Sequence, residues 1–163
     1  MTVVVSDTSV LCYLALIGRL DVLEKLFNEV VIPNAVLVEC LHRGAPEVVR
    51  NALAPTVPSF FKISATDPEP LPETETLDVG EAVAITIAWH HRADSLLLLD
   101  EKRGRNIAAA LGLRLRGVLG IVVECHRRNI LDFDSTMTRL RQLGFRISTA
   151  TLENARRQLG IIS

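Results

Sequence analysis

Four acidic side chains in this sequence stand where an α/β fold would bring them to one end of a parallel sheet. Asp7 and Asp100 follow apolar runs typical of buried strands, and Glu39 and Glu81 lie in segments typical of helices. Ligands of open α/β sheets bind outside the carboxyl ends of the strands. Carboxylates gathered there repel one another unless a cation joins them. The four acids therefore predict a site for a hard metal ion.

Asp7 and Glu39 also have structural interpretations that need no metal. Asp7 precedes a predicted helix, so its carboxylate could cap that helix. Ser9 could cap the helix equally well, which would leave Asp7 free. Glu39 stands on the flank of an apolar helical stripe, where the alternative to a site residue is a solvated carboxylate.

Glu81 and the pair Asp100-Glu101 likewise have two interpretations each. Asp78 and Glu81 fit a capping box, with Glu81 at the third helical position. The helix around Glu81 is apolar almost all round, which favours a buried helix whose Glu81 carboxylate points inward toward the sheet. Asp100 and Glu101 end a run of leucines and start a helix, so one of them could cap it while the other faces the cleft.

A basic run, made of Lys102, Arg103 and Arg105, follows these two acids. Such a run is most often a solvated helix face. Its functional interpretation is a rim of cations that contacts phosphate groups beside the metal site. Ser9 could hydrogen-bond either Asp7 or a phosphate oxygen.

Cleavage of a phosphodiester is a reaction that suits this set of residues. The transition state carries negative charge, which carboxylates cannot stabilise directly. Mg²⁺ held by carboxylates can stabilise it and can lower the pKa of a bound water that acts as the nucleophile. Because Mg²⁺ keeps several waters, a few carboxylates suffice. We expect Asp7 and Asp100 to bind the metal directly, and Glu39 and Glu81 to bind through water or to orient the attacking water.

Alternating strands and helices are expected to position these residues. Continuous apolar runs predict strands at 3–5, 30–32, 60–63, 95–99 and 113–115. Helical spacing of apolar residues predicts helices at 10–17, 20–27, 35–42, 46–53, 78–90, 102–111, 119–128, 135–143 and 151–159. This order predicts an α/β fold with a parallel sheet that helices cover on both faces.

Length and composition agree with a single domain over residues 1–163, of which 48% are apolar. Residues 65–76 carry several prolines and acids, and we expect a surface loop there rather than a domain boundary. The formal net charge of −1 provides no global basic field for nucleic acid, although a local basic patch is still compatible with it. No apolar stretch is long enough to span a membrane, and the N-terminal apolar run meets Asp7 too early for a signal peptide.

The three cysteines, Cys12, Cys40 and Cys125, lie far apart in the sequence and form no CxxC pair. We expect buried free thiols. An odd number of cysteines without a signal peptide suggests a reducing cytosol, so the expected location is cytoplasmic.

Other candidate motifs are weaker. His90 and His91 are adjacent and should point to different sides of a helix, which argues against a shared metal. Cys40-x-His42 lacks two further ligands for zinc. No glycine-rich dinucleotide motif and no P-loop is present, and Gly117-Val118-Leu119-Gly120 is a weak phosphate signal.

The order and number of the motifs resemble those of PIN-domain proteins over almost the whole chain. The residues that carry the likeness are Val5-Ser6-Asp7-Thr8-Ser9, Ile32-Pro33 with Glu39 after it, Leu77-Asp78-Val79-Gly80-Glu81-Ala82, Leu99-Asp100-Glu101-Lys102-Arg103-Gly104-Arg105, Gly112-Leu113, Gly117-Val118-Leu119-Gly120 and Gly144-Phe145-Arg146-Ile147-Ser148. More narrowly, the chain resembles the branch described as domain of unknown function 3368, which is related to the VapC-type toxins of toxin–antitoxin pairs.

The resemblance implies a three-layer α/β/α fold and Mg²⁺- or Mn²⁺-dependent cleavage of RNA. It implies an acidic quartet of Asp7, Glu39, Glu81 and Asp100. Many PIN domains carry Asp where Glu81 stands, and many have Thr-x-Asp after the fourth strand where this chain has Leu98-Leu99-Asp100-Glu101. Either Asp100 or Glu101 could therefore be the main ligand, and we favour Asp100.

The predicted function is that of a metal-dependent endoribonuclease, the toxin of a type II toxin–antitoxin pair. The expected partners are RNA, a small antitoxin protein and a second copy of the chain. One alternative is a non-catalytic PIN-like binding or regulatory module, against which the intact acid set argues. The other is a phosphohydrolase with Asp7 as an aspartyl nucleophile, but such enzymes usually have a second Asp where Ser9 stands.

Overall fold

The chain forms two compact units in the computed structural model, which describes all residues from 1 to 163. The first unit comprises Met1–Val118 and the second Leu119–Ser163. A five-stranded sheet with only parallel pairings forms the centre of the first unit. Its strands, in spatial order, are β3 (Phe61–Ile63), β2 (Val30–Ile32), β1 (Val3–Ser6), β4 (Ser95–Leu98) and β5 (Leu115–Arg116).

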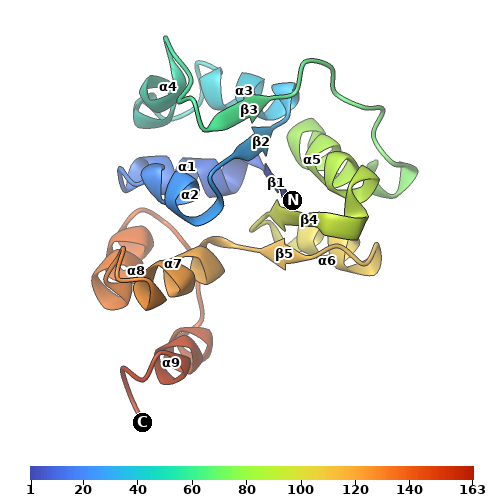
Figure 1. Cartoon of the computed structure of the whole chain (residues 1–163). Coiled ribbons are helices and arrows are strands. Elements are labelled where there is room, and N and C mark those ends of the chain that lie inside the picture. The colour runs from blue at the N-terminus through green and yellow to red at the C-terminus, as the bar shows by residue number, and fades with distance from the viewer. The chain divides into compact units, whose positions relative to one another are not determined.

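Helices cover both faces of this sheet. They are α1 (Thr8–Leu16), α2 (Asp21–Phe27), α3 (Asn34–Leu41), α4 (Glu47–Leu53), α5 (Val79–His90) and α6 (Lys102–Ala110), with short 3-10 helices η1 (Pro72–Thr74) and η2 (Arg92–Asp94). Figure 1 shows α1 and α2 on one side of the sheet and α5 and α6 on the other. This arrangement confirms the predicted three-layer α/β/α fold.

The two central strands and α5 form the core that positions the site. Val5 of β1 and Leu97 of β4 are fully buried, as expected for strands covered on both faces. α5 is buried from Gly80 to Ala88 and packs directly on β1 and β4. A helix that crosses over between parallel strands runs back against them, so the first turn of α5 lies at their carboxyl edge.

The carboxyl ends of β1 and β4 form the switch point of the sheet. These strands are neighbours, in register from Val3 opposite Ser95 to Ser6 opposite Leu98. From β1 the chain continues through α1 and α2 to β2, whereas from β4 it continues through α6 to β5 on the other side. Connections that leave in opposite directions open a crevice between the two strand ends, which is where ligands of α/β sheets bind.

Most element boundaries differ from the predicted ones by only one or two residues, which is the usual uncertainty of helix ends. The last strand, β5, begins two residues later than predicted. Asn34 is the first helical residue of α3. The Asp67 carboxylate accepts hydrogen bonds from the Asn34 and Ala35 backbone N–H groups at 2.9 and 2.8 Å, so a residue of the predicted loop caps this helix.

The second unit is helical. After α7 (Val118–Arg127), which begins at the last residue of the first unit, it contains α8 (Phe133–Gln142) and α9 (Thr149–Gln158). Asp132 caps α8 and Ser148 caps α9. An ion pair of 3.0 Å between Arg156 and Asp134 joins the two helices. In the whole chain, no helix has the length and apolar character needed to cross a membrane.

Candidate active site

Asp7 directly follows β1 and is the N-cap of α1. Its Oδ1 accepts a hydrogen bond from the Val10 backbone N–H at 3.1 Å, and its Oδ2 accepts one from the Ser9 hydroxyl at 2.7 Å. The interpretation in which Ser9 caps the helix is therefore wrong. Asp7 is 1% exposed, so its carboxyl group is almost completely separated from water.

Asp100 and Glu101 have separate roles after β4. Glu101 is exposed and caps α6, because its Oε1 accepts a hydrogen bond from the Arg103 N–H at 3.4 Å. Asp100 is half-buried, and its Oδ2 accepts one from the Val118 N–H at 2.9 Å. The sequence predicts that one of these two acids caps the helix and the other faces the cleft, but it does not show which acid does which. Asp100 is the acid that lies at the switch point.

Glu39 connects three helices. Its Oε1 accepts a hydrogen bond from the Gly80 N–H of α5 at 2.9 Å, and its Oε2 accepts one from the Thr8 hydroxyl of α1. Glu39 is itself on α3 and is only partly exposed. The interpretation of Glu39 as a solvated carboxylate is therefore wrong.

Glu81 lies in the first turn of α5 and makes no capping box. Asp78 is the N-cap residue, but its side chain accepts no hydrogen bond from the helix. The Glu81 side chain points inward instead: the residue is 8% exposed, and its Oε1 is buried without any hydrogen-bond partner. An unsatisfied buried oxygen costs about 1–3 kcal/mol, so it indicates a group that lacks its natural counterpart.

Three glycines make room for the carboxyl groups. A Cβ atom added at Gly80 would lie 2.7 Å from both Glu39 carboxylate oxygens, and one at Gly104 would lie 2.7 Å from Glu81 Oε1. A Cβ atom added at Gly117 would lie 2.5 Å from Asp100 Oδ1. Any side chain at these positions would displace an acid.

The acids act on one another electrostatically. Burial raises the pKa of Asp7 to about 7, against the hydrogen bonds from Ser9 and Val10, and Asp100 raises it further. Burial likewise raises the pKa of Glu81 to about 7, helped by the negative charges of Asp7, Glu101, Asp78 and Glu39. Burial also raises the pKa of Asp100, although the Val118 N–H and Arg105 oppose the shift. The structure therefore brings Asp7, Glu39, Glu81 and Asp100 together, with Glu101 at their edge.

The donor set suits a hard divalent cation. As the side chains stand, no three or more His, Cys, Asp or Glu residues are grouped so that they could hold a metal ion. Even so, carboxylate oxygens are the ligands that such cations prefer. The unpartnered Glu81 Oε1 and the raised pKa values of Asp7 and Glu81 are features that a nearby positive charge would relieve.

The predicted substrate-binding residues differ in their distance from the acids. Arg105 lies beside Asp100, since its Nη1 would be 2.9 Å from a Cβ atom at Gly117 and its charge lowers the pKa of Asp100. Arg103 is exposed and donates a hydrogen bond of 3.4 Å to the Thr76 carbonyl, and Lys102 is exposed as well. The Ser9 hydroxyl is bonded to Asp7, which was one of its two predicted partners.

Sequence reasoning missed Thr8 and the Val118 N–H as partners of the acids. Thr8 stands between Asp7 and Ser9, so a hydroxyl next to the strand-end acid was the available signal. The turn at Gly117 had suggested a weak phosphate site, but its Val118 N–H donates to Asp100 instead.

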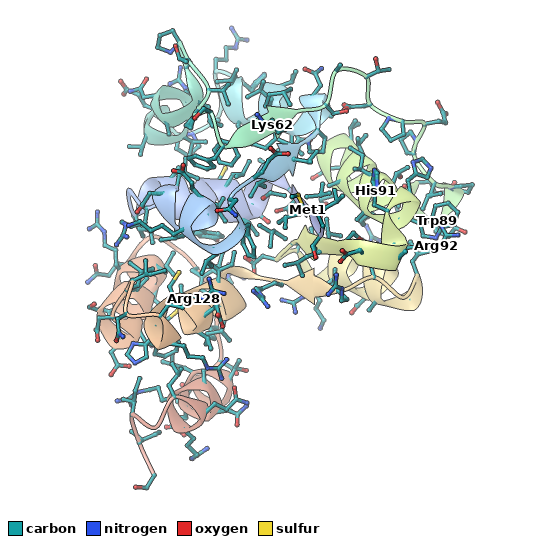
Figure 2. All side chains as sticks on the ribbon, in the orientation of Figure 1. Met1, Lys62, Trp89, His91, Arg92 and Arg128 are labelled. Atoms are coloured by element: carbon teal, nitrogen blue, oxygen red, sulfur yellow. The ribbon has the colours of Figure 1, made fainter.

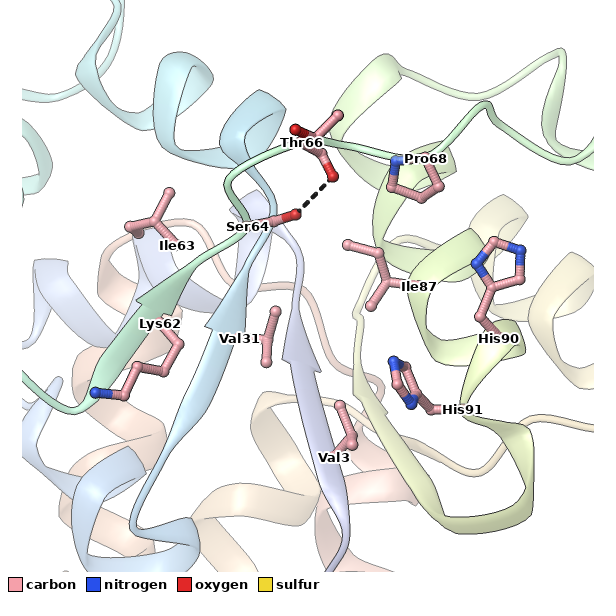
Figure 3. A pocket seen from close by; sticks show the side chains of 10 residues that line it. All are labelled: Val3, Val31, Lys62, Ile63, Ser64, Thr66, Pro68, Ile87, His90 and His91. Atoms are coloured by element: carbon pink, nitrogen blue, oxygen red, sulfur yellow. Dashed lines mark hydrogen bonds between the residues drawn. The ribbon is translucent and has the colours of Figure 1, made fainter.

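A separate hollow of about 430 Å³ lies away from these acids (Figure 3). No acidic residue lines it, and its polar residues are Lys62, Ser64, Thr66, His90 and His91. The two histidines end α5, whereas Glu81 begins it. Both line the same hollow rather than opposite sides of the helix (Figure 3). Figure 2 shows His91 near Trp89 and Arg92, whose guanidinium lies over the Trp89 ring. The residues that line the hollow do not form a group of metal ligands.

A comparison with protein-family models gives one finding that bears on this site. The model of domain of unknown function 3368, described as a PIN domain, matches residues 3–161. It therefore spans nearly the whole chain and confirms the resemblance inferred from the motifs. Comparisons with curated proteins and with solved structures give no match.

Proposed function

The chain belongs to the PIN-domain family, whose members are in general nucleases that use divalent metal ions, and on that premise we propose that it is a Mg²⁺- or Mn²⁺-dependent endoribonuclease. The observation that carries the proposal is the cluster of four carboxyl groups at the switch point of the sheet. Within it, Glu81 Oε1 is buried without a partner. The family match over 3–161 also supports one PIN-like domain over 1–163.

In this proposal Asp7 and Asp100 hold the cation, with Glu101 as a peripheral ligand beside Asp100. A bound divalent cation supplies charge neutralisation and an activated water. The Val10 N–H, the Ser9 hydroxyl and the Val118 N–H fix the orientation of the two aspartates.

The two glutamates have a different proposed role. The Thr8 hydroxyl and the Gly80 N–H hold Glu39, and the space at Gly104 admits the Glu81 carboxyl. Because Glu81 has a pKa of about 7, it can accept a proton from an attacking water near neutral pH. Glu39 and Glu81 therefore bind the cation through water or orient the attacking water.

Arg105, Arg103 and Lys102 are the proposed contacts to the RNA backbone. All three are exposed at the start of α6, next to the acid that follows β4. Guanidinium and ammonium groups bind phosphate oxygens by charge-assisted hydrogen bonds, independently of sequence. Cations beside the carboxyl cluster would bring the scissile phosphate to it.

We also propose a biological context. The relation of this branch to VapC-type toxins supports a type II toxin that acts in the cytoplasm, forms a homodimer and is bound by a small antitoxin protein. A short reading frame for a small protein directly upstream of the gene is the arrangement that this context predicts.

Metal-dependent cleavage of RNA is the direct test. Purified protein should cleave RNA in the presence of Mn²⁺, EDTA should stop the reaction, and excess Mn²⁺ should restore it. Cleavage products on denaturing gels provide the measurement. Cleavage that persists in EDTA would contradict the proposal. Metal binding without any cleavage would favour the alternative of a non-catalytic PIN-like module.

Proton and metal binding should compete at the acid cluster. Asp7 and Glu81 have pKa values near 7 in the folded protein, above ordinary values of 3.8 and 4.5, so the folded state holds more protons than the unfolded state between about pH 4 and 7. Without metal, stability should therefore fall as pH rises through this range. At pH 8 saturating Mn²⁺ should raise the melting temperature by about 5–10 °C, with a much smaller shift at pH 5.

Thermal denaturation of EDTA-treated protein at several pH values measures both effects. The Asp7→Asn variant is the control, because its amide oxygen can still accept the Val10 N–H while the charge is lost. This variant should show a smaller pH effect and little response to Mn²⁺. An equal response to Mn²⁺ at pH 5 and pH 8 would argue against binding at this cluster.

The phosphohydrolase alternative is disfavoured by the surroundings of Asp7. The Ser9 hydroxyl donates a hydrogen bond of 2.7 Å to Asp7 Oδ2. The hydroxyl of Ser9 holds Asp7 in place, whereas a second aspartate would be needed there.

A further inference from the structure

The hollow beside the end of α5 lies over β1, β2 and β3, on a part of the sheet that α5 leaves open (Figure 3). α5 packs on β1 and β4. Val31 of β2 is paired with Val5 on one side and with Lys62 on the other. Paired residues of parallel strands point to the same face, as do residues two apart such as Val3 and Val5. Val3 and Val31 are only partly buried, so an aliphatic surface stays open beside α5.

The segment that follows β3 forms one wall of this hollow, with residues between 64 and 68. Two anchors hold the segment. The Asp67 carboxylate accepts hydrogen bonds from the start of α3, and the Leu71 N–H donates one of 3.0 Å to the Thr86 hydroxyl of α5. The wall is therefore in place before a ligand binds, which lowers the ordering cost of binding.

One half of the hollow favours an anion. Lys62 lies on one side of Val31 and His91 lies on the other (Figure 3). The Lys62 ammonium is 3.9 Å from a Glu29 carboxylate oxygen, and both side chains are more than half exposed. Such an exposed pair contributes little, so the ammonium remains available. An imidazole provides at least one N–H donor in either protonation state.

The other half combines an apolar surface with polar groups. Ile87 and Pro68 provide the apolar surface, and Thr66 and His90 stand at its border (Figure 3). The Ser64 hydroxyl donates a hydrogen bond of 3.1 Å to the Thr66 carbonyl, which leaves the Ser64 oxygen as an acceptor. A flat ring with polar atoms along its edge matches this half, as an anionic group matches the first.

We propose that this hollow binds a nucleotide, whose phosphate lies between Lys62 and His91 and whose base lies against Ile87 and Pro68. Its volume of about 430 Å³ is within the usual range of small-ligand sites, about 300–1,000 Å³. A phosphate receives charge-assisted hydrogen bonds from the ammonium and the imidazole. The same chemistry has two sources, a free mononucleotide and one unit of an RNA strand.

This site is separate from the acid cluster. Glu81 lies in the first turn of α5 and His90 is its last residue, so the rise of the helix puts them about 14 Å apart along its axis. Carboxylates repel a phosphate unless a cation joins them, whereas no carboxylate lines the hollow. Nucleotide binding in the hollow therefore requires no metal and does not rest on the proposed cleavage of RNA.

Titration of the full-length protein in EDTA with adenosine 5′-monophosphate or uridine 5′-monophosphate, followed by NMR, tests the site. EDTA prevents any metal at the acid cluster from binding the phosphate. Amide signals of residues 64–67 and 87–91 should shift together, and those of Asp7 and Asp100 should stay in place. Adenosine and inorganic phosphate each carry half of the ligand, so each should bind at least about 10-fold more weakly.

Two variants remove the proposed phosphate contacts at exposed positions. Lys62→Met and His91→Gln should each weaken the binding of adenosine 5′-monophosphate by about 10- to 100-fold. Lys25→Met is the matched control, because Lys25 is also exposed and pairs with an acid, Asp21, at 2.9 Å. It lies outside the hollow and should bind as the wild type does.

A single-stranded oligoribonucleotide distinguishes the two sources. Binding of the strand that is tighter than that of the mononucleotide, and that Lys62→Met weakens, would identify RNA as the source. Equal or weaker binding of the strand would identify the free mononucleotide. Three results would overturn the proposal: no shift in residues 64–67 and 87–91 at millimolar nucleotide, shifts confined to the acid cluster, or equal affinity for inorganic phosphate alone. If the protein cleaves no RNA, the proposed function fails, while these binding measurements still decide the site.

Discussion

Replacing Asp100 by Asn should abolish Mn²⁺-dependent cleavage of RNA, with a loss of at least about 100-fold in initial rate. Removal of outer groups that only orient a metal ligand already costs up to about 100-fold, so loss of a direct ligand should cost no less. The variant should still fold, because the Asn oxygen can accept the hydrogen bond that the Val118 N–H donates to Asp100. Initial rates at saturating Mn²⁺, together with circular dichroism, provide the measurement.

The same strand offers a matched control. Asp94 precedes β4 as Asp100 follows it, and it is exposed, with Arg114 at 2.9 Å and the N-terminal amine at 3.6 Å. Asp94→Asn should therefore keep the cleavage rate. Asp7→Asn should lose activity as Asp100→Asn does. If Asp7→Asn and Asp100→Asn both cleaved RNA at the wild-type rate, the activity would belong to a contaminating nuclease.

The sheet, and the gathering of acids at its carboxyl edge, could be predicted from local patterns. The run before Asp7 and the leucines before Asp100 are continuously apolar, as strands buried on both faces require. Helices between such strands make the pairings parallel, so all strands end at the same edge. Two acids that follow two strands then meet wherever those strands are neighbours, as β1 and β4 are.

The hydrogen-bond partners of the acids could not be predicted, because they come from distant segments. Glu39 binds the Gly80 N–H 41 positions away, and nothing local in α3 distinguishes that carboxylate from a solvated one. Asp7 and Ser9 are equally good caps by propensity, so only the tertiary structure decides between them.

At Glu81 the local patterns left two interpretations, a capping box and an inward-pointing carboxylate, and the structure agrees with the second. The capping box predicted from Asp78 and Glu81 would keep that carboxylate at the helix end. In the structure α5 is buried from its second residue onward, and the space left at Gly104 accepts the carboxyl group instead. Burial of the Glu81 carboxyl group thus prevails over the local capping pattern. Such departures from local rules are expected at functional sites.

Replacing Glu81 by Gln should therefore separate stability from activity. Glutamine has nearly the same shape and cannot ionise, so the variant avoids the cost of a buried charge beside Asp7 and Glu39. Between about pH 4.5 and pH 7 the Glu81 carboxyl group of the wild type is ionised in the unfolded state but still protonated in the folded state. The wild type therefore loses stability as pH rises through this range, whereas the variant does not. Without metal, the stability of Glu81→Gln relative to the wild type should thus grow from about pH 4.5 to pH 7. Above pH 7 the difference should stay constant. The Mn²⁺-induced rise in melting temperature should shrink, and cleavage should fall by at least about 10-fold.

Melting temperatures in EDTA and in Mn²⁺ from pH 4.5 to pH 8, with cleavage rates at pH 8, measure these effects. Glu47→Gln is the matched control, since Glu47 also lies in the first turn of a helix but is exposed. It should change neither the response to Mn²⁺ nor the cleavage rate. Full activity in Glu81→Gln would show that this carboxyl group has only a structural role, because the unpartnered Oε1 would then serve neither a cation nor a water. Loss of activity with unchanged or higher stability would instead show that the fold tolerates a costly buried acid because the reaction requires it.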